Sequence, residues 1–185
     1  MLKLGAIPVA SRPLLSAVTW HYNHEFDEAM ARAIDLLVAA GADVNAQDGA
    51  GDTLLHNAAL EYSHQSTEEN YFGSSDGCNY TAVQRLLHHG AFPDPVGKGG
   101  RTPLMLAADS GSVDALQILI AAGVNPQRKD HCGQTAMDRA RQAYAKLQSQ
   151  TDEFTTPEDQ AGYQTYLKQR QQCVEVLTNA GLPPQ

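Results

Sequence analysis

The sequence predicts an all-helical stack of four repeats, and three observations lead to that fold class. Four segments begin with a short, largely apolar run, and after each one a second apolar run ends at a glycine. In the third copy the closing glycine, Gly123, lies 21 positions after the start, Thr102, whereas in the first, second and fourth copies the distance is 29, 37 and 46 positions. Thr102 and the next start, Thr135, are 33 residues apart. The third copy is therefore the basic unit, and the others contain insertions; the starts are Arg12, Thr53, Thr102 and Thr135, and the closing glycines are Gly41, Gly90, Gly123 and Gly181.

Each repeat is expected to begin with a capped helix. A threonine hydroxyl can accept a hydrogen bond from a free backbone N–H there, and proline at the first helical position, as at Pro103, loses none. Small residues such as Ala58 and Ala59 let neighbouring helices approach closely. A closing glycine suits the left-handed conformation that ends a helix, and turn-rich segments over 41–53 and 123–135 then join the repeats as fingers. The second helix of each repeat carries an apolar stripe, formed by Ile34/Leu37, Val83/Leu86, Leu116/Leu119 and Val174/Leu177.

A period of 33 with a T-P-L-H-x-A-A start resembles the ankyrin repeat. The motif residues are Thr53, His56, Ala58 and Ala59, then Thr102, Pro103, Leu104, Ala107 and Ala108, then 41–46 and 48–53. The departures are Arg12 for threonine, Leu15, Met105 and Asp138 for histidine, and Arg141 for the second alanine. The resemblance implies an ankyrin repeat solenoid of four helix-turn-helix repeats, at about 12–44, 53–94, 102–126 and 135–183 in a single domain, 1–185. It also implies binding to other proteins, and His56 is expected to bond neighbouring backbone.

The insertions fall between the two helices of repeats 1, 2 and 4. The second forms an inserted loop, 61–80, rich in Ser, Asn, Gly and acids, and loops of that length in compact domains are usually functional or disordered. The fourth predicts an extended helical hairpin, 142–172, formed by helices over 134–149 and 157–179, with Tyr163 and Tyr166 packed on Tyr144 or Leu147. Eleven of the twelve aromatic residues lie in or beside insertions, and Phe92 is the exception. Those aromatics either anchor a partner or pack the insertions onto the repeats, and Trp20 either joins such an interface or fills the exposed end of repeat 1.

Charge narrows the choice of partner. The formal net charge is -8, which argues against nucleic acid and anionic membranes as partners. Residues 13–84 contain eleven acids and one base, whereas ten acids and ten bases follow. This asymmetry favours a partner protein with a basic surface, although solubility alone also accounts for net charge. The predicted partner-binding residues are Asp43, Asp48, Asp52, Glu68, Glu69, Tyr71, Phe72, Asp76, Trp20 and Tyr22.

No metal, cofactor or catalytic residue is predicted. His21 and His24 share helical spacing, but no further Cys/His pair completes a tetrahedral zinc site. Cys132 has no evident activating neighbour, and the three cysteines show no paired spacing, which favours reduced thiols in a cytoplasm. No stretch approaches the ~20 apolar residues that span a bilayer. We also expect no secretory signal, because residues 12–18 already belong to the first repeat.

The predicted function is a non-catalytic interaction module. The chain resembles the short stand-alone ankyrin proteins of bacteria, some of which serve as immunity partners for secreted toxins. That resemblance favours an inhibitor that binds and occludes a toxin or effector, and we expect a monomer when it is free. An adaptor or scaffold that uses the same surface without inhibition is the alternative. A metal-dependent or thiol enzyme is the third possibility, and it would require bound metal or a reactive cysteine.

Overall fold

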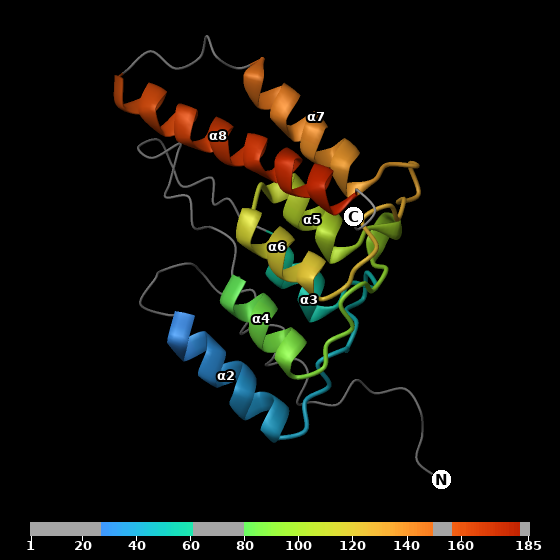
Figure 1. Ribbon diagram of the computed structural model, residues 1–185. Coiled ribbons are helices and arrows are strands. Elements are labelled where there is room, and N and C mark those ends of the chain that lie inside the picture. Colours follow the sequence, from blue (N-terminus) through green and yellow to red (C-terminus); the bar gives the residue numbers. More distant parts are fainter. Residues whose placement is uncertain (1–26, 61–79, 150–156, 182–185) are drawn as a thin grey trace.

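The computed structural model describes residues 27–60, 80–149 and 157–181 (Figure 1). Its regular elements are helical apart from one isolated bridge between Gln47 and Thr53, which confirms the predicted all-α class. The helices are α2 (Asp27–Ala39), α3 (Leu54–Ala59), α4 (Tyr80–His88), α5 (Pro103–Ser110), α6 (Val113–Ala121), α7 (Ala136–Gln148) and α8 (Pro157–Ala180), with a short 3-10 turn, η2 (Lys98–Gly100). Tyr80, which the sequence places in the inserted loop, is thus the first residue of α4.

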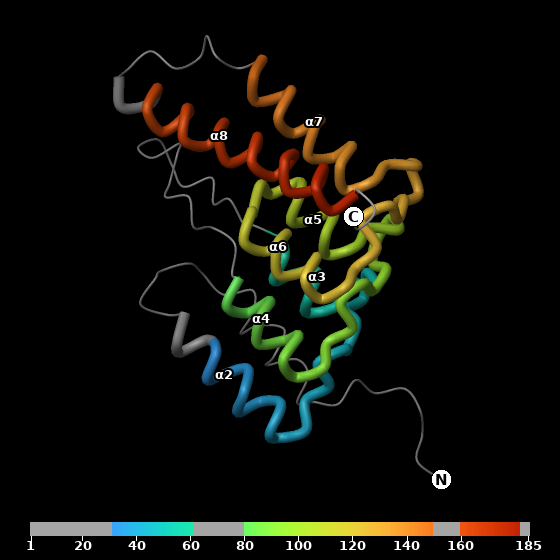
Figure 2. The backbone as a smooth tube through the Cα atoms, viewed as in Figure 1, coloured from blue at the N-terminus to red at the C-terminus, as the bar shows by residue number. Residues whose placement is uncertain are grey.

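The helices form two layers. Helices α3, α5 and α7 pack on one another in that order, and α2, α4, α6 and α8 form a second series beside them. Within a repeat the two layers meet through α3 and α4, α5 and α6, and α7 and α8. Figures 1 and 2 show the second series as successive rungs. Each described repeat therefore buries its apolar side against its neighbours, as expected of a solenoid.

The core follows the predicted stripes and small residues. The alanine pairs at 58–59 and 107–108 are fully buried, so α3 and α5 approach their neighbours closely. In the second series, Leu37 of α2 and Val174 of α8 are only partly buried against the core. The other stripe residues are buried: Ile34, Val83, Leu86, Leu116, Leu119 and Leu177. The fourth repeat keeps Ala140 inside, whereas Arg141, which stands in place of the second alanine, is exposed.

The starts of α3, α5 and α7 are held by a threonine and, in α3 and α7, also by the side chain three residues later. The hydroxyls of Thr102 and Thr135 accept hydrogen bonds from the N–H groups of Met105 and Asp138, at 3.4 and 3.2 Å. His56 Nδ1 lies 3.0 Å from both the backbone N and the Oγ1 of Thr53. Asp138 Oδ2 makes the same two contacts with Thr135, at 2.9 and 2.8 Å. Aspartate in the histidine position therefore preserves the helix start, and these bonds from the Thr135 N–H and hydroxyl lower the pKa of Asp138.

The closing glycines follow the prediction in three of four repeats. Gly41, Gly90 and Gly123 adopt left-handed backbone conformations with φ of 89°, 84° and 82°. The prediction is wrong for Gly181, which is not among the glycines with positive φ. Its N–H continues the helical pattern by donating to the Leu177 carbonyl at 3.0 Å, so α8 ends without a left-handed residue there.

Helix α8 is tied to both inner neighbours. Tyr163 is buried and its hydroxyl donates to the Leu147 carbonyl at 2.9 Å, which confirms the expected packing of Tyr163 against α7. Arg170 donates to the carbonyl of Asp109 and lies over the Tyr166 ring. It thereby satisfies a free carbonyl at the end of α5. A Cβ added to Gly111 would lie 2.6 Å from Arg170 Nε, so the turn after α5 leaves room for this side chain.

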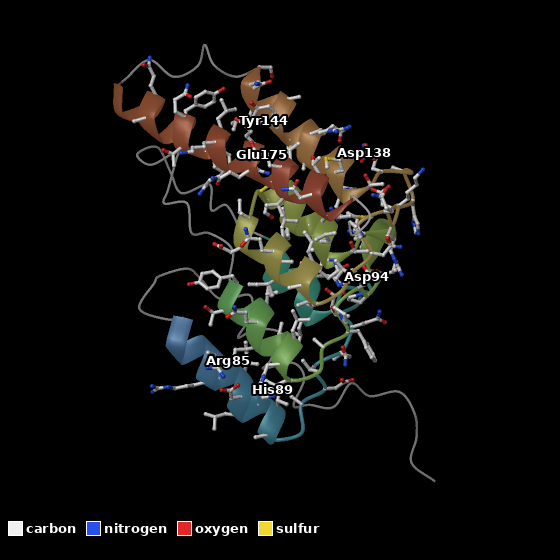
Figure 3. The ribbon with its side chains drawn as sticks, in the orientation of Figure 1. Arg85, His89, Asp94, Asp138, Tyr144 and Glu175 are labelled. Atoms are coloured by element: carbon white, nitrogen blue, oxygen red, sulfur yellow. The ribbon has the colours of Figure 1, made fainter. Side chains whose placement is uncertain are left out.

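Helix α2 is attached to α4 by a charged cluster. His89 Nε2 lies 2.7 Å from Asp35 Oδ1, and Arg85 lies 3.5 Å from Asp35 Oδ2 (Figure 3). The hydrogen bond with His89, together with the charge of Arg85, lowers the pKa of Asp35 below its ordinary value. These contacts lie at the edge of the interface where Ile34 and Val83 are buried.

Candidate protein-binding surface

Three fingers lie side by side along one side of the stack: finger 1 (41–53), finger 2 (90–102) and finger 3 (123–135) (Figure 1). Phe92 donates its N–H to Asn45 Oδ1 at 2.8 Å, and Asn45 Nδ2 donates to the Gly90 carbonyl at 3.3 Å. His131 donates its N–H to the Gly99 carbonyl at 2.9 Å. We call the combined surface the finger row. Because each finger is bonded to the next, the row forms one continuous surface.

His56 joins α3 to finger 2. Its Nε2 lies 3.1 Å from the Arg101 carbonyl, so this nitrogen carries the proton while Nδ1 accepts from Thr53. Burial lowers the pKa of His56 below its ordinary value, and the ring is accordingly neutral at physiological pH. This confirms the expectation that His56 bonds neighbouring backbone, and it assigns the residue a structural role.

The predicted acids of finger 1 shape the finger itself. Asp43 Oδ1 accepts from the Asn45 N–H at 2.9 Å. Asp48 Oδ1 accepts from the N–H groups of Ala50 and Asp52, at 2.8 and 3.0 Å. Asp43 is exposed, whereas Asp48 and Asp52 are half-buried. Of the three, Asp43 presents its charge most openly to a partner.

Asp52 of finger 1 supplies a carboxylate that finger 2 lacks. Asp48 in finger 1 and Asp130 in finger 3 each accept two backbone N–H bonds from their own finger, whereas finger 2 has Gly97 at the equivalent position. The Lys98 N–H instead donates to Asp52 Oδ1 at 2.8 Å. A Cβ on Gly97 would lie 2.0 Å from that oxygen. The carboxylate of Asp52 therefore occupies the space that a side chain at position 97 would fill.

Finger 3 is fixed to the inner helices by a buried charge cluster. Arg139 of α7 contacts Asp130 with two guanidinium nitrogens and Asp109 of α5 with a third, at 2.6 Å. Burial raises the pKa of Asp109 despite the opposing charge of Arg139. Burial also opposes the ionisation of Asp130, but the hydrogen bonds from Arg139 and the finger backbone outweigh it and lower the pKa of Asp130. This cluster explains the place of Arg139, which the repeat pattern left unassigned.

Asp94 connects fingers 2 and 3. Its Oδ2 lies 3.1 Å from Arg128 Nε, and Figure 3 shows it beside the finger loops. Burial raises the pKa of Asp94, while Arg128 and the Asn125 N–H oppose that shift. Asp94 stands where finger 1 has Asn45, whose amide both accepts from Phe92 and donates to Gly90. A carboxylate cannot donate, and Asp94 Oδ1 is buried without a hydrogen-bond partner among the described residues.

Finger 2 also carries exposed apolar residues that the sequence analysis did not select. Phe92 is 66% exposed and Val96 is 45% exposed. The available signal was twofold. Phe92 is the one aromatic outside the insertions, and it stands where fingers 1 and 3 have Asp43 and Asn125.

Seven predicted partner-binding residues lie outside the described residues. They are Trp20, Tyr22, Glu68, Glu69, Tyr71, Phe72 and Asp76. The finger row therefore places three of the ten predicted residues, Asp43, Asp48 and Asp52, on one surface. These three remain predictions as partner contacts.

Across 27–60, 80–149 and 157–181, no three His, Cys, Asp or Glu side chains gather closely enough to hold a metal ion. Within the same ranges, no helix has the length and apolar character to cross a membrane. Cys132 is exposed on finger 3 and Cys173 is buried in α8.

Paired helices in two layers, joined by a row of fingers, define a helical repeat protein. Two family models agree with that class: "Ankyrin repeats (3 copies)" matches residues 71–147, and "Ankyrin repeats (many copies)" matches residues 28–66. The chain belongs to the ankyrin repeat family. Ankyrin repeats are in general non-catalytic modules that bind other proteins, and this establishes the broad class of function.

Named relatives share this repeat region. The chain is 31% identical over 142 residues to the B-cell lymphoma 3 protein homolog of Mus musculus, a match covering 76% of this chain and 28% of that protein. It is 41% identical over 92 residues to the mouse nuclear factor NF-kappa-B p105 subunit, covering 49% and 8%. It is 54% identical over 41 residues to YahD of Escherichia coli (strain K12), which is described as an ankyrin repeat protein, covering 22% and 20%. The matched region thus spans less than a third of each relative.

Proposed function

We propose that this chain is an inhibitor of the immunity type, which binds a toxin or effector protein in the cytoplasm and blocks it by occlusion. Membership of the ankyrin repeat family supports binding to another protein, and we propose in addition that this partner has a basic surface and is inhibited when bound. The free chain is proposed to be a monomer. Inhibition by occlusion requires no catalytic group and no cofactor, only a rigid surface that covers the partner's working site.

The acidity of finger 1 is the observation that carries the proposal. Finger 1 contains Asp43, Asp48 and Asp52 and no base, so its formal charge is -3. Each carboxylate is held by at least one backbone N–H, which fixes the position of the charges before a partner arrives. Preorganised charge of one sign speeds the capture of an oppositely charged protein and sets its orientation.

The inserted segments supply the rest of the proposed interface. Tyr71 and Phe72, which have Glu68, Glu69 and Asp76 close by in the sequence, are a candidate anchor, since aromatic residues dominate binding energy at many interfaces. Trp20 and Tyr22 are candidates in the first insertion. In this proposal the acids accelerate association and the aromatics slow dissociation.

Affinity capture from cells of the source organism, followed by an activity assay of the captured protein, tests the proposal. The Asp43→Lys variant is the sharpest probe, because Asp43 is the most exposed of the three acids and makes one hydrogen bond within its own finger. Asp48 accepts two backbone hydrogen bonds and Asp52 holds the next finger, so replacing either would confuse binding with folding. Glu175→Lys, at an exposed site on α8 (Figure 3), is the matched control with the same change of charge. We expect Asp43→Lys to lower the association rate several-fold at low salt and Glu175→Lys to change it little.

The double variant Tyr71→Ala/Phe72→Ala tests the proposed aromatic anchor, and we expect it to dissociate from the partner faster than wild type does. A single basic protein that loses activity when wild type is added would support inhibition. A partner that keeps full activity in the complex would make the chain an adaptor. Association rates unaffected by Asp43→Lys would remove finger 1 from the interface.

A further inference from the structure

Phe92 is exposed on a backbone that has little freedom to move. Pro93 and Pro95 flank Asp94, and proline fixes the φ angle of its own residue. The Phe92 N–H is bonded to Asn45 in finger 1, and Asp94 is paired with Arg128 in finger 3. The segment 92–96 is therefore held on both sides by neighbouring fingers. An exposed aromatic on such a segment loses little entropy when it is buried by a partner.

Folding does not account for the choice of phenylalanine at this position. The equivalent residues, Asp43 and Asn125, are polar and exposed, as solvent-facing finger positions usually are. Phe92 leaves 66% of its surface in solvent, and Val96 of the same segment leaves 45%. A surface substitution away from caps and the core usually changes stability by less than about 0.5 kcal/mol. We therefore expect replacement of either residue to cost the stack little stability, while both present apolar surface to solvent.

Charge around Phe92 is asymmetric. Finger 1 has a formal charge of -3, whereas finger 2 has Lys98 and Arg101 against Asp94, and finger 3 has Arg128 and Lys129 against Asp130. Asp43 Oδ1 holds the N–H of Asn45, and Asn45 Oδ1 holds the N–H of Phe92. The exposed acid and the exposed aromatic therefore belong to one hydrogen-bonded network. Finger 3, with its excess of bases, lies on the side of finger 2 away from finger 1.

We propose that Phe92 and Val96 form the apolar anchor of the finger row, which docks into an apolar pocket of a partner protein whose Lys or Arg side chains beside the pocket face Asp43. This proposal rests on the proposed protein-binding function and names the contact. Rigid aromatics that enter a pocket are frequent centres of binding energy. The excess of bases on fingers 2 and 3 repels the partner's basic side there, so the partner docks in one orientation.

Site-specific photocrosslinking tests the contact directly. The probe is the full chain with Phe92 replaced by p-benzoylphenylalanine, expressed in cells of the source organism and irradiated. Leu36, which is 71% exposed on α2 and lies outside the three fingers, receives the same replacement as the matched control. We expect one discrete adduct from position 92 and none of the same mass from position 36. Mapping should place the attachment in an apolar pocket with Lys or Arg beside it.

Affinity measurements with the crosslinked protein, after purification, complete the test. Phe92→Ala should weaken binding at least tenfold, while Leu36→Ala and Glu175→Lys change it less than twofold; circular dichroism should show all three variants folded. Asp43→Lys added to the photoreactive chain should reduce the adduct. The absence of a discrete adduct at position 92, an attachment site without basic neighbours, or binding indifferent to Phe92→Ala would overturn the proposal. A partner captured by wild type but insensitive to Phe92→Ala would leave the proposed function standing, and an adduct to a partner that stays active would leave the docking contact without inhibition.

Discussion

Single residues in this protein are best understood by comparing equivalent positions in neighbouring repeats. Asp138 holds the Thr135 helix start as His56 holds the Thr53 start, so two different side chains satisfy the same free donors. Asp52 substitutes in the same way for the carboxylate that finger 2 lacks at Gly97. An acid that contributes to an acidic patch can therefore also be a structural residue of the next finger.

Placing an aspartate at position 97, as in the other two fingers, tests whether Asp52 occupies its space. Gly97→Asp alone should destabilise the protein by more than about 1 kcal/mol, because its Cβ would lie 2.0 Å from Asp52 Oδ1 and 2.8 Å from His56 Nε2, and two carboxylates would crowd together. Asp52→Gln alone should cost roughly 1 kcal/mol through the lost Lys98 bond. The double variant has aspartate at the finger 2 position that corresponds to Asp130 and glutamine at the finger 1 position that corresponds to Gln134. We expect it to be more stable than the sum of the single changes by at least about 1 kcal/mol in urea unfolding. Additive losses would show that Asp52 and position 97 do not compete for space.

Whole elements show where prediction from the sequence succeeds. Periodicity identifies the buried side of a helix because apolar residues recur at the helical repeat, and it therefore found Ile34, Val83 and Leu116. It also predicted the two long helices of the fourth repeat, α7 and α8. Periodicity cannot predict contacts between segments that are distant in the sequence. Arg170 meets the end of α5 61 residues earlier in the chain, and the role of Asp52 depends on a glycine in another finger.

Loss of the Arg139 cluster should destabilise the fold, and the loss of stability should depend on pH. Arg139→Met should leave the Asp130 carboxylate, with 1% of its side chain exposed, without a countercharge, at a cost of roughly 2–4 kcal/mol near pH 7. Arg141→Met, on the exposed side of α7, should cost less than about 0.5 kcal/mol. The low pKa of Asp130 in the folded wild type stabilises the fold above the unfolded pKa, and this stability is lost as pH falls. In the wild type that loss begins only near the unfolded pKa of 3.8. In the variant, Arg139 no longer opposes the burial of Asp130, and burial favours the protonated acid, so protonation should recover part of the deficit between pH 7 and pH 4. Urea unfolding of wild type and variant at pH 7 and pH 4 measures this deficit in stability. A deficit that stays constant with pH would contradict the role given to the Asp130 charge.

At the scale of the molecule, stability is distributed along a row of neighbours. Helix α2 packs on α4, whereas α7 packs on α5 and α8, and α8 also reaches α6. In such an array each repeat is stabilised mainly by the adjacent ones. A rigid binding surface that extends over three fingers therefore depends on several local interfaces, and damage at one end need not loosen the other.

Amide hydrogen exchange of Arg139→Met should make this distribution visible. Because the substitution weakens the attachment of α7 and finger 3, exchange should accelerate most in α7 and α8 and less in α5, while α2 stays close to wild type. Exchange by local opening reports the stability of each segment, and only full unfolding exposes all of them together. Mass-spectrometric exchange of wild type, Arg139→Met and Arg141→Met under identical conditions makes the comparison. Equal acceleration in α2 and α7 would mean that the repeats open as one unit, and fingers 1 and 3 would then lose their binding geometry together.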